Sequence, residues 1–243
     1  MKKVLIFVIS AQFPPYDRMI PQAMETWDDS SLEGTETIFY CGEPDRPNTD
    51  RIIYFQIKEG YDGMGHKDLA AYRWALECRQ WDYMARVNAS CYVHKRRLRD
   101  HCQQLPDKGL MRGLVVGAHP YCGVQRPFMW GGGQYIFSRD VVQTFVDNGD
   151  KWNHGVMEDC SMSELAHDTG IVMDTNGRVC SVNKQGDGWV AVAYNGEGQG
   201  GSFATFKETA DSLHDQFFFR VKNDGDRTVD AEVMRLLKQY LPA

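Results

Sequence analysis

The stretch KDLAAYRWALECRQWDYMARVNASCYV, residues 67–93, places a helical pattern directly before a short apolar run. Three apolar residues of its first part recur at the spacing of one helix face: Leu69, Tyr72 and Leu76. This periodicity predicts a helix over Lys67–Cys78, and the run Tyr83–Val87 that follows reads as a buried strand. A helix that leads into a strand is half of the βαβ unit of parallel sheets, so the neighbouring segments are expected to continue the alternation.

The alternation of strands and helices continues on both sides of this stretch. The further predicted strands are Val4–Ile9, Thr37–Tyr40, Ile52–Ile57 and Leu114–Val116, and the further predicted helices are Met19–Trp27 and Tyr92–Gln104. Such alternation predicts an α/β fold, in which a mostly parallel sheet carries helices on both faces. In sheets of this kind ligands bind beyond the carboxyl ends of the strands, so functional residues are expected just after each strand.

After Pro127 the pattern changes to shorter elements. The expected elements are a strand at Gln134–Phe137, a helix at Arg139–Val146, a helix from near Glu158 to just before Gly170, a strand at Gln216–Lys222 and a final helix with Val229, Val233, Leu236 and Tyr240 on one face. Residues 186–201 contain six glycines, which predicts a loop rather than a core element, either a lid over a ligand or a merely mobile segment. Since there is no repeat and no linker, residues 1–243 are expected to form a single domain.

Composition places the chain among ordinary globular proteins. Of its 243 residues, 42% are hydrophobic and 25% are charged, which argues against disorder. The net charge of -6 gives no overall attraction to nucleic acid or to an anionic membrane, although it does not forbid a local basic patch. The apolar run Val4–Ile9 has no credible cleavage site after it and is far shorter than the roughly 20 residues of a membrane span, so it reads as a first strand.

Cysteine usage bears on the cellular compartment. The chain has seven cysteines, an odd number, and no two of them form a CxxC pair. Structural zinc and a disulfide framework are therefore not expected, and a reducing, cytoplasmic location is the simplest prediction.

Six segments stand out in a fixed order. They are GMGHKDLAAYRWAL (63–76), WDYMARVNASCYV (81–93), GLVVGAHP (113–120), FMWGGGQYIFSRD (128–140), MEDCSMSELAHDTGI (157–171) and FFFRVKNDGDRTVD (217–230). The first five resemble segments of the fringe and β-1,3-galactosyltransferase-like glycosyltransferases, and the whole set resembles the soluble viral and bacterial relatives of that family still more closely. The resemblance implies a GT-A type fold, with residues 1–120 as the nucleotide-binding half and residues 121–243 as the acceptor and catalytic half. It also implies hexosyl or pentosyl transfer, with inversion, from a nucleotide sugar to an acceptor hydroxyl, and a UDP-sugar is the expected donor.

One segment departs from the family pattern. Where the family carries an aspartate run that holds a divalent cation against the donor diphosphate, this chain has Asn88-Ala89-Ser90. Mn²⁺ and Mg²⁺ favour charged oxygen ligands, whereas asparagine and serine offer only neutral ones. Two alternatives stay open: Asn88 and Ser90 hold a metal weakly with help from elsewhere, such as His214, or positive side chains replace the metal.

Asp159 is the predicted catalytic base. It matches the Glu-Asp motif of the family at the start of a helix, where the helix dipole favours a charged carboxylate. Glu158 is the alternative base or an orienting neighbour. On spacing alone the two acids would only cap the helix, since acidic first turns are common.

Four cations are candidates for holding the leaving diphosphate: Lys67, Arg86, Arg220 and Lys222. Arg86 lies two residues before Asn88 and thus on the same side of an extended strand, and Arg220 and Lys222 alternate in the same way on the last strand. Guanidinium groups bind phosphate oxygens through paired hydrogen bonds. The competing interpretation is that each is a solvated surface charge.

Two further groups of residues are expected at the donor. Ser10 and Ala11 end the first predicted strand, Cys41 and Gly42 end the second, and all four are predicted to border the nucleotide base. In the Trp130-Gly131-Gly132-Gly133 segment, the glycines allow the backbone to approach a sugar and Trp130 offers a flat face for its ring, although a tight turn without a ligand is also possible.

The acceptor is not fixed by the sequence. The basic segment His94-Lys95-Arg96-Arg97-Leu98-Arg99 is either a solvated helix face or a binding surface for an anionic acceptor. A glycan and a hydroxymethylated base of viral DNA are both candidate acceptors. A rival hypothesis is a non-catalytic protein that binds a nucleotide sugar or a glycan and has lost its metal site. A dinucleotide-binding oxidoreductase is excluded, because no GxGxxG follows the first strand. No oligomeric state is predicted.

Overall fold

The first strand, β1 (Val4–Ile9), lies inside the main sheet and is buried along its whole length. The computed structural model describes residues 1–28, 30–42, 45–118, 125–193, 200–211, 213, 215–223, 225 and 227–241. The side chains of β1 divide between two hydrophobic cores, the even-numbered ones entering the first core and the odd-numbered ones the second. Because successive side chains of a strand point to opposite faces, this division places β1 between two covering layers.

Within the described residues the main sheet has seven strands. Their order is β10 (Met173–Asp174), β6 (Met111–Arg112), β9 (Tyr135–Ser138), β4 (Tyr83–Asn88), β1, β2 (Thr35–Gly42) and β3 (Ile52–Phe55). The strands β1 to β4 run parallel, and β9 runs antiparallel to both of its neighbours. Ile9 of β1 lies beside Tyr40 of β2 and Asn88 of β4, so the carboxyl ends of these strands meet at one edge of the sheet.

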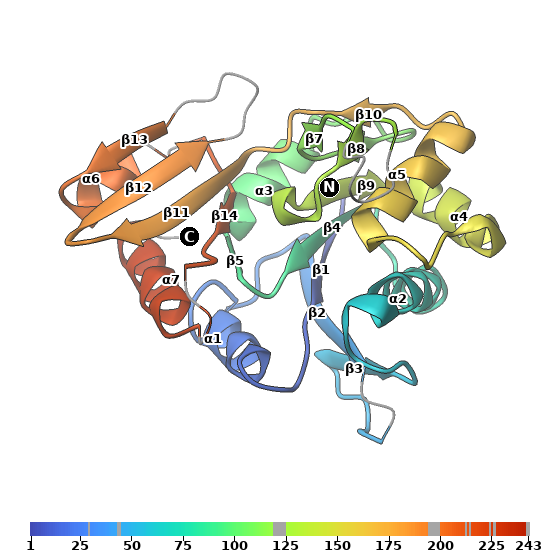
Figure 1. The fold of residues 1–243 in the computed structure, drawn as a ribbon, viewed down its shortest axis with the longest axis horizontal. Coiled ribbons are helices and arrows are strands. Elements are labelled where there is room, and N and C mark those ends of the chain that lie inside the picture. The colour runs from blue at the N-terminus through green and yellow to red at the C-terminus, as the bar shows by residue number, and fades with distance from the viewer. Residues whose placement is uncertain are drawn as a thin grey trace.

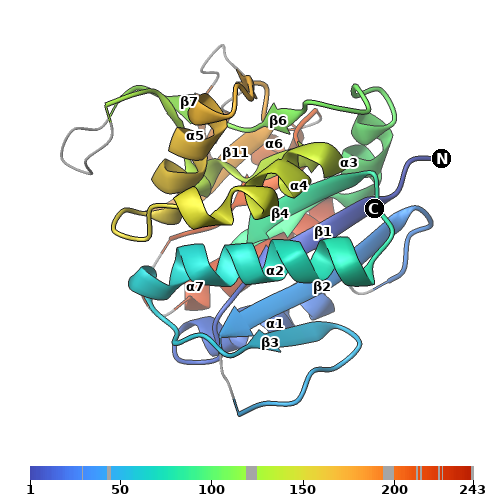
Figure 2. The same ribbon diagram turned by 90° about the vertical axis from the view of Figure 1, so that its right-hand side faces the viewer.

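Helices cover both faces of the main sheet (Figures 1 and 2). The odd-numbered side of β1 packs against α2 (Met64–Cys78), α4 (Arg139–Asp147) and α5 (Glu158–Asp168). The other side packs against α1 (Met19–Glu25), α3 (Lys95–Cys102) and α7 (Thr228–Tyr240). Of the helices in the described parts of the chain, none combines the length and the apolar character needed to cross a lipid bilayer.

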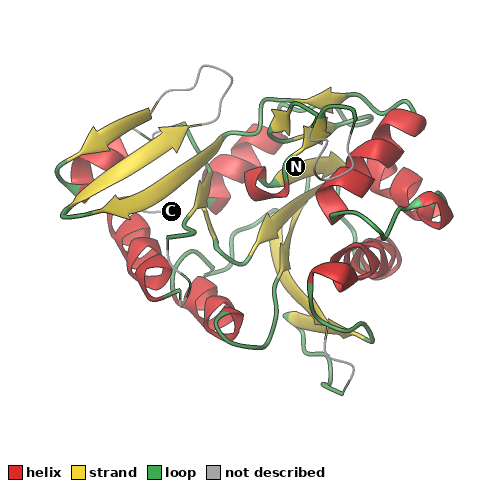
Figure 3. Ribbon diagram, viewed as in Figure 1, coloured by secondary structure: helices red, strands yellow, loops and turns green. Residues whose placement is uncertain are grey.

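A second sheet joins the layer on the even-numbered side (Figure 3). Its order is β13 (Gly200–Phe203), β12 (Gly188–Ala193), β11 (Val179–Gln185), β14 (Phe218–Arg220) and β5 (Cys91–Val93), and α6 (Phe206–Asp211) lies beside β12 and β13. The chain passes from the main sheet to this one through Ala89 and Ser90, which join β4 to β5. The segment Asn88-Ala89-Ser90 therefore lies at the junction of the two sheets.

The predicted α/β fold class is confirmed. β1 and β4 coincide with predicted strands, and α2, α4, α5 and α7 lie within a few residues of their predicted bounds. Both sheets contain strands from before and after residue 120. The main sheet combines β4 with β9 and β10, and the second sheet combines β5 with β14. The two halves of the chain are thus interleaved in one α/β unit.

The predicted loop at residues 186–201 is wrong for its first part. Residues 188–193 form β12, which pairs with β11 as a hairpin. Alternate side chains of this strand are buried, among them Trp189 and Ala191, and Trp189 packs edge-on against Phe206. The number of glycines suggested a loop, but the residues alternate between buried and more exposed positions, which is typical of a strand on a sheet face. Residues 194–199 lie outside the described residues.

Two other predicted elements are corrected. The helix expected at Tyr92–Gln104 begins only at Lys95, because the fully buried run Cys91–Val93 forms β5. His94 caps this helix by accepting a hydrogen bond from the Arg97 backbone N–H. The strand expected at Leu114–Val116 is the two-residue β7 (Val115–Val116), which pairs with β8 (Phe128–Met129) outside the main sheet.

Candidate functional site

A cavity of about 500 Å³ opens beyond the carboxyl ends of β1 and β4, where the two sheets meet. Twelve of the predicted site residues line it: Ser10, Ala11, Lys67, Asn88, Ser90, Trp130, Gly131, Gly132, Glu158, Asp159, Arg220 and Lys222. They come from the ends of β1 and β4, from α2 and α5, from the glycine segment between β8 and β9, and from β14 and the segment after it. The structure therefore brings Asp159 and Arg220, which are 61 residues apart in the sequence, to one shared space.

The other predicted residues that the structure describes, Arg86, Cys41 and Gly42, do not line the cavity. Arg86 is fully buried behind it, and Cys41 is enclosed in a hydrophobic core. Gly42 packs against the backbone of Ile57, and its N–H donates to the Glu59 carboxylate at 2.5 Å. The end of the second strand thus positions Glu59, which does line the cavity, instead of bordering a ligand itself. His214 lies outside the described residues.

Asp159 is held at the N-terminus of α5 by two backbone donors. The Gly131 N–H donates to Asp159 Oδ2 at 2.9 Å, and the Cys160 N–H donates to Oδ1 at 2.8 Å. The carboxylate is 2% exposed and borders the cavity. Helix dipole and backbone donors both favour a carboxylate at this point, and they fix its direction.

Glu158, the preceding residue, is buried beside a guanidinium. Arg86 Nη2 donates to Glu158 Oε1 at 3.1 Å. Burial raises the pKa of Glu158 to about 7, since the favourable charge of Arg86 offsets this effect only in part and the nearby acids Asp68 and Asp159 add to it. Glu158 thus exchanges its proton near neutral pH, in the range where a general acid or base is most effective. We call Glu158 and Asp159 the acidic wall.

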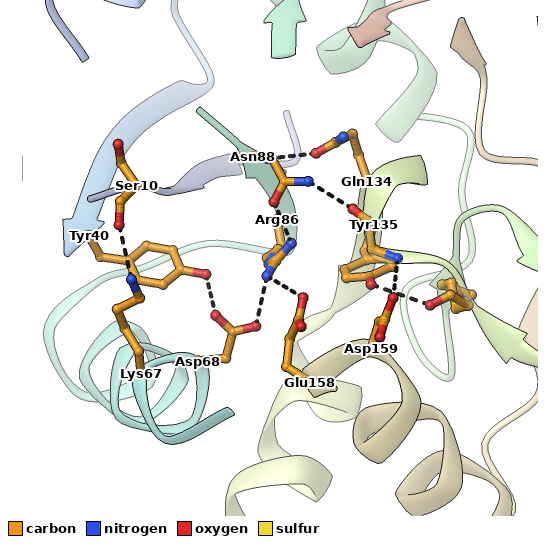
Figure 4. Close-up of polar contacts among 12 residues, drawn as sticks. Ser10, Tyr40, Lys67, Asp68, Arg86, Asn88, Gln134, Tyr135, Glu158 and Asp159 are labelled. Atoms are coloured by element: carbon orange, nitrogen blue, oxygen red, sulfur yellow. Dashed lines mark hydrogen bonds and ion pairs between the residues drawn. The ribbon is translucent and has the colours of Figure 1, made fainter. Parts of the chain in front are cut away.

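Arg86 forms the centre of a buried polar network behind this wall (Figure 4). Besides Glu158, it contacts Asp68 Oδ2 at 3.2 Å, and the ring of Tyr135 lies 5.4 Å from its guanidinium. Tyr40 OH donates to the other oxygen of Asp68 at 2.7 Å. The prediction that Arg86 binds phosphate does not fit this geometry, because its side chain is 0% exposed and is occupied by two carboxylates. Its role is to orient Glu158 and to balance the buried acids.

Asn88 is bound at both ends of its side-chain amide (Figure 4). Its Oδ1 accepts from Arg86 Nη1 at 2.9 Å, and its Nδ2 donates to the carbonyl oxygen of Gly131 at 3.0 Å. Its backbone N–H donates to Gln134 Oε1 at 2.6 Å. These contacts tie the end of β4 to the glycine segment that holds Asp159.

Three cationic side chains from the second half of the chain also line the cavity. Arg220 lies on β14, with its guanidinium 4.8 Å from the ring centre of Trp130, and Lys222 follows two residues later and is exposed. Arg227 also lines the cavity and was missed by the sequence analysis. It is held by Asp230 Oδ2 at 3.0 Å and by Tyr16 OH at 3.3 Å. We call Arg220, Lys222 and Arg227 the basic wall.

Lys67 lines the cavity but is already paired with an acid. Its Nζ donates to Glu59 Oε2 at 2.6 Å and to the carbonyl oxygen of Ser10 at 3.0 Å, and the residue is 3% exposed. The pair connects α2 to the end of β1. Because Glu59 cancels its charge, Lys67 contributes less to a phosphate site than its sequence position suggested.

The mouth of the cavity carries apolar side chains that no sequence pattern singled out. Phe13 is 39% exposed, Tyr61 is 72% exposed and Met157 is 45% exposed, and all three line the cavity. Exposed large apolar residues that gather at one opening mark a ligand-contacting surface. They lie in loops and short turns, where no periodicity distinguishes them from ordinary surface residues.

The basic side chains Lys95, Arg97 and Arg99 of α3 bind other parts of the protein and lie away from the cavity. Lys95 pairs with Asp28 at 3.0 Å, and Arg97 donates to the backbone oxygens of Leu213 and Gln216. Arg99 contacts the backbone oxygen of Glu33, just before β2 begins and thus at the edge of the main sheet opposite the cavity. The geometry gives no support to the hypothesis that this segment grips an anionic acceptor of the site.

Comparison with known proteins identifies only remote similarities. No protein-family model matches the chain, and no curated protein matches its sequence. Among solved structures, the chain is similar to a glycosyltransferase involved in the glycosylation of the major capsid of PBCV-1, with a TM-score of 0.49 and 12% identity over 95% of this chain and 98% of that one. It is also similar to 2-C-methyl-D-erythritol 4-phosphate cytidylyltransferase from Thermus thermophilus, with a TM-score of 0.40 and 9% identity over 71% of this chain and 86% of that one. Neither similarity is strong enough to assign an activity.

Proposed function

We propose that this protein is a glycosyltransferase that moves a sugar, with inversion, from a nucleotide sugar to an acceptor hydroxyl. The observation that carries the proposal is that the acidic and basic walls line one cavity. Such a transfer requires a base for the acceptor proton and positive charge for the departing diphosphate, and both must act in a site with little water. A UDP-sugar is the proposed donor, and the acceptor hydroxyl belongs to a glycan or to a modified base.

In this mechanism Asp159 accepts the proton of the acceptor hydroxyl. The acceptor oxygen then forms a bond to the anomeric carbon, while the bond from that carbon to the diphosphate oxygen breaks and its electron pair stays on the diphosphate. The backbone donors of Gly131 and Cys160 keep Asp159 aimed at the acceptor. Glu158 borders the same space and is held by Arg86, so its protonation modulates the local charge.

The first test is a turnover assay with UDP-, GDP-, CDP-, ADP- and dTDP-sugars that measures release of the nucleoside diphosphate. In the variant Asp159→Asn, loss of the base should lower kcat by about 10²- to 10⁴-fold, whereas the affinity for the nucleoside diphosphate should be retained. Asp168→Asn is the matched control, because Asp168 lies at the other end of α5, exposed and paired with Arg126.

Two outcomes would contradict the proposal. Unchanged turnover in Asp159→Asn would remove the assigned base. Binding of a nucleotide sugar by the wild-type protein without turnover, with or without a divalent metal, would favour the rival hypothesis of a non-catalytic binding protein.

A further inference from the structure

The segment Asn88-Ala89-Ser90 does not fit the divalent cation that the family resemblance implies. Asn88 Oδ1 already accepts from Arg86 Nη1 at 2.9 Å, so a metal at this oxygen would lie close to a buried guanidinium and be repelled by it. Ala89 offers no side-chain ligand, and Ser90 offers one neutral hydroxyl. Across the described parts of the chain, no three side chains of aspartate, glutamate, histidine or cysteine come together as a ligand set.

Positive side chains stand next to this same segment. β14 pairs antiparallel with β5, so Arg220 lies opposite Cys91, and the Val221 N–H donates to the carbonyl oxygen of Ser90 at 3.0 Å. Val221 is fully buried, whereas Arg220 and Lys222 alternate with it and both line the cavity. The second sheet therefore delivers two cations to the end of β4, where the family places its metal ligands.

Arg227 adds a third cation with a fixed orientation. Its guanidinium is held by Asp230 and lies 5.1 Å from the ring centre of Tyr16, which also shares a hydrogen bond with it. The residue is 4% exposed and lines the cavity. A guanidinium that is already oriented loses little conformational entropy when it binds a phosphate, because its planar fork is organised in advance.

We propose that the basic wall holds the donor diphosphate directly and that no divalent cation is required for this binding. The inference rests on the proposed function for the identity of the ligand. Arg220 and Lys222 supply positive charge that a metal would otherwise bring, and guanidinium groups match phosphate oxygens in geometry as well as in charge. Asp230 balances the charge of Arg227, which contributes oriented hydrogen-bond donors.

The test measures the binding of UDP, and of inorganic pyrophosphate as a probe without a base, by titration calorimetry in EDTA and in MnCl₂. We expect the same affinity for UDP in both buffers. Arg220→Ala and Lys222→Ala should each weaken UDP binding in EDTA by about 10- to 100-fold, as expected for the loss of a charged hydrogen bond. Lys184→Ala is the control, since Lys184 lies on β11 of the same sheet, outside the cavity, in a surface pair with Glu232.

The outcomes separate this inference from the proposed function. UDP binding that appears only with Mn²⁺, or that survives both substitutions in EDTA, would overturn the metal-free site and leave the transferase proposal standing. UDP binding in EDTA without transfer of any sugar would support the site and overturn the transferase proposal. Because Lys222 is exposed, Lys222→Ala keeps the test decisive even where Arg220→Ala destabilises the fold.

Discussion

The two walls of the cavity present their charges in different ways. Asp159 and Glu158 are almost fully buried at the start of α5, and each carboxylate is held by partners from other segments. The basic wall comes from the second sheet and the segment before α7. There Lys222 is exposed and Arg220 is only partly buried, whereas Arg227 is as buried as the acids and is paired with Asp230. A proton acceptor has to be fixed to a fraction of an ångström, whereas cations that hold a diphosphate must remain accessible to it.

The two walls also lie on different elements of the fold. Lys67 and Glu59 lie in the same cavity, but they are close enough to form an ion pair, and their net contribution to its field is small. The acidic wall lies at the start of α5, whereas the basic wall lies on β14 and in the segment that follows it, and both line the cavity. We therefore expect the interior network behind the acidic wall to govern stability and the basic wall to govern affinity.

The largest effect is expected for Arg86→Met, which removes the buried support of the acidic wall. Asp68 and Glu158 would then be buried without a counterion, and the free energy of unfolding should fall by about 3–5 kcal/mol. Arg126→Met is the matched control, because Arg126 also bridges two carboxylates, Glu164 and Asp168, but at the surface; its loss should cost less than about 1 kcal/mol. Urea unfolding of both variants measures the difference, and equal losses would refute the assignment of Arg86 to the interior.

A smaller effect is expected from the titration of Glu158. Because its pKa is raised to about 7 in the folded protein, the protonated form stabilises the fold at low pH, and this contribution is lost as the pH rises through 7. The free energy of unfolding of the wild-type protein should therefore contain a fall of about 2 kcal/mol between pH 5 and pH 8 that Glu158→Gln abolishes. Urea unfolding at the two pH values tests this, with Glu164→Gln on the same helix as control. An identical pH dependence in wild type and Glu158→Gln would contradict the assigned titration.

The smallest effect is expected at Gly132, which lies beside Trp130 and Arg220. A methyl group there would overlap the ring of Trp130 and come within 2.5 Å of Arg220 Nη1, so Gly132→Ala must displace both side chains. We expect the affinity for UDP to fall by about tenfold, which corresponds to about 1.4 kcal/mol. Gly117→Ala is the control, since a methyl group at that glycine meets nothing within 4 Å. Equal affinities for the two variants would show that the contact between Trp130 and Arg220 does not shape the site.

Local patterns in the sequence were sufficient for much of the site. The apolar runs of β1 and β4 predicted the sheet edge at which Ser10 and Asn88 lie, and the alternation of Arg220 and Lys222 predicted that they share a face. The local pattern also placed Glu158 and Asp159 at the start of a helix, whereas their catalytic role was implied only by the family resemblance. In each case the information is contained in a few neighbouring residues, because hydrophobic period and strand alternation are local properties.

What the sequence by itself determined is the four parallel strands β1 to β4, the strands β9 and β14 and the helices α1, α2, α4, α5 and α7, and hence that Asp159 and Arg220 lie at the ends of such elements. Tertiary structure alone decided which charges are partners. Arg86 contacts Asp68, 18 residues away, and Glu158, 72 residues away. Because of these contacts, Arg86 holds the buried acids in place and does not bind phosphate as the sequence predicted. Arg227 and Tyr16 meet across 211 residues. The energy of a charged side chain depends on its burial and on its spatial neighbours, and neither quantity is encoded in the spacing of adjacent residues.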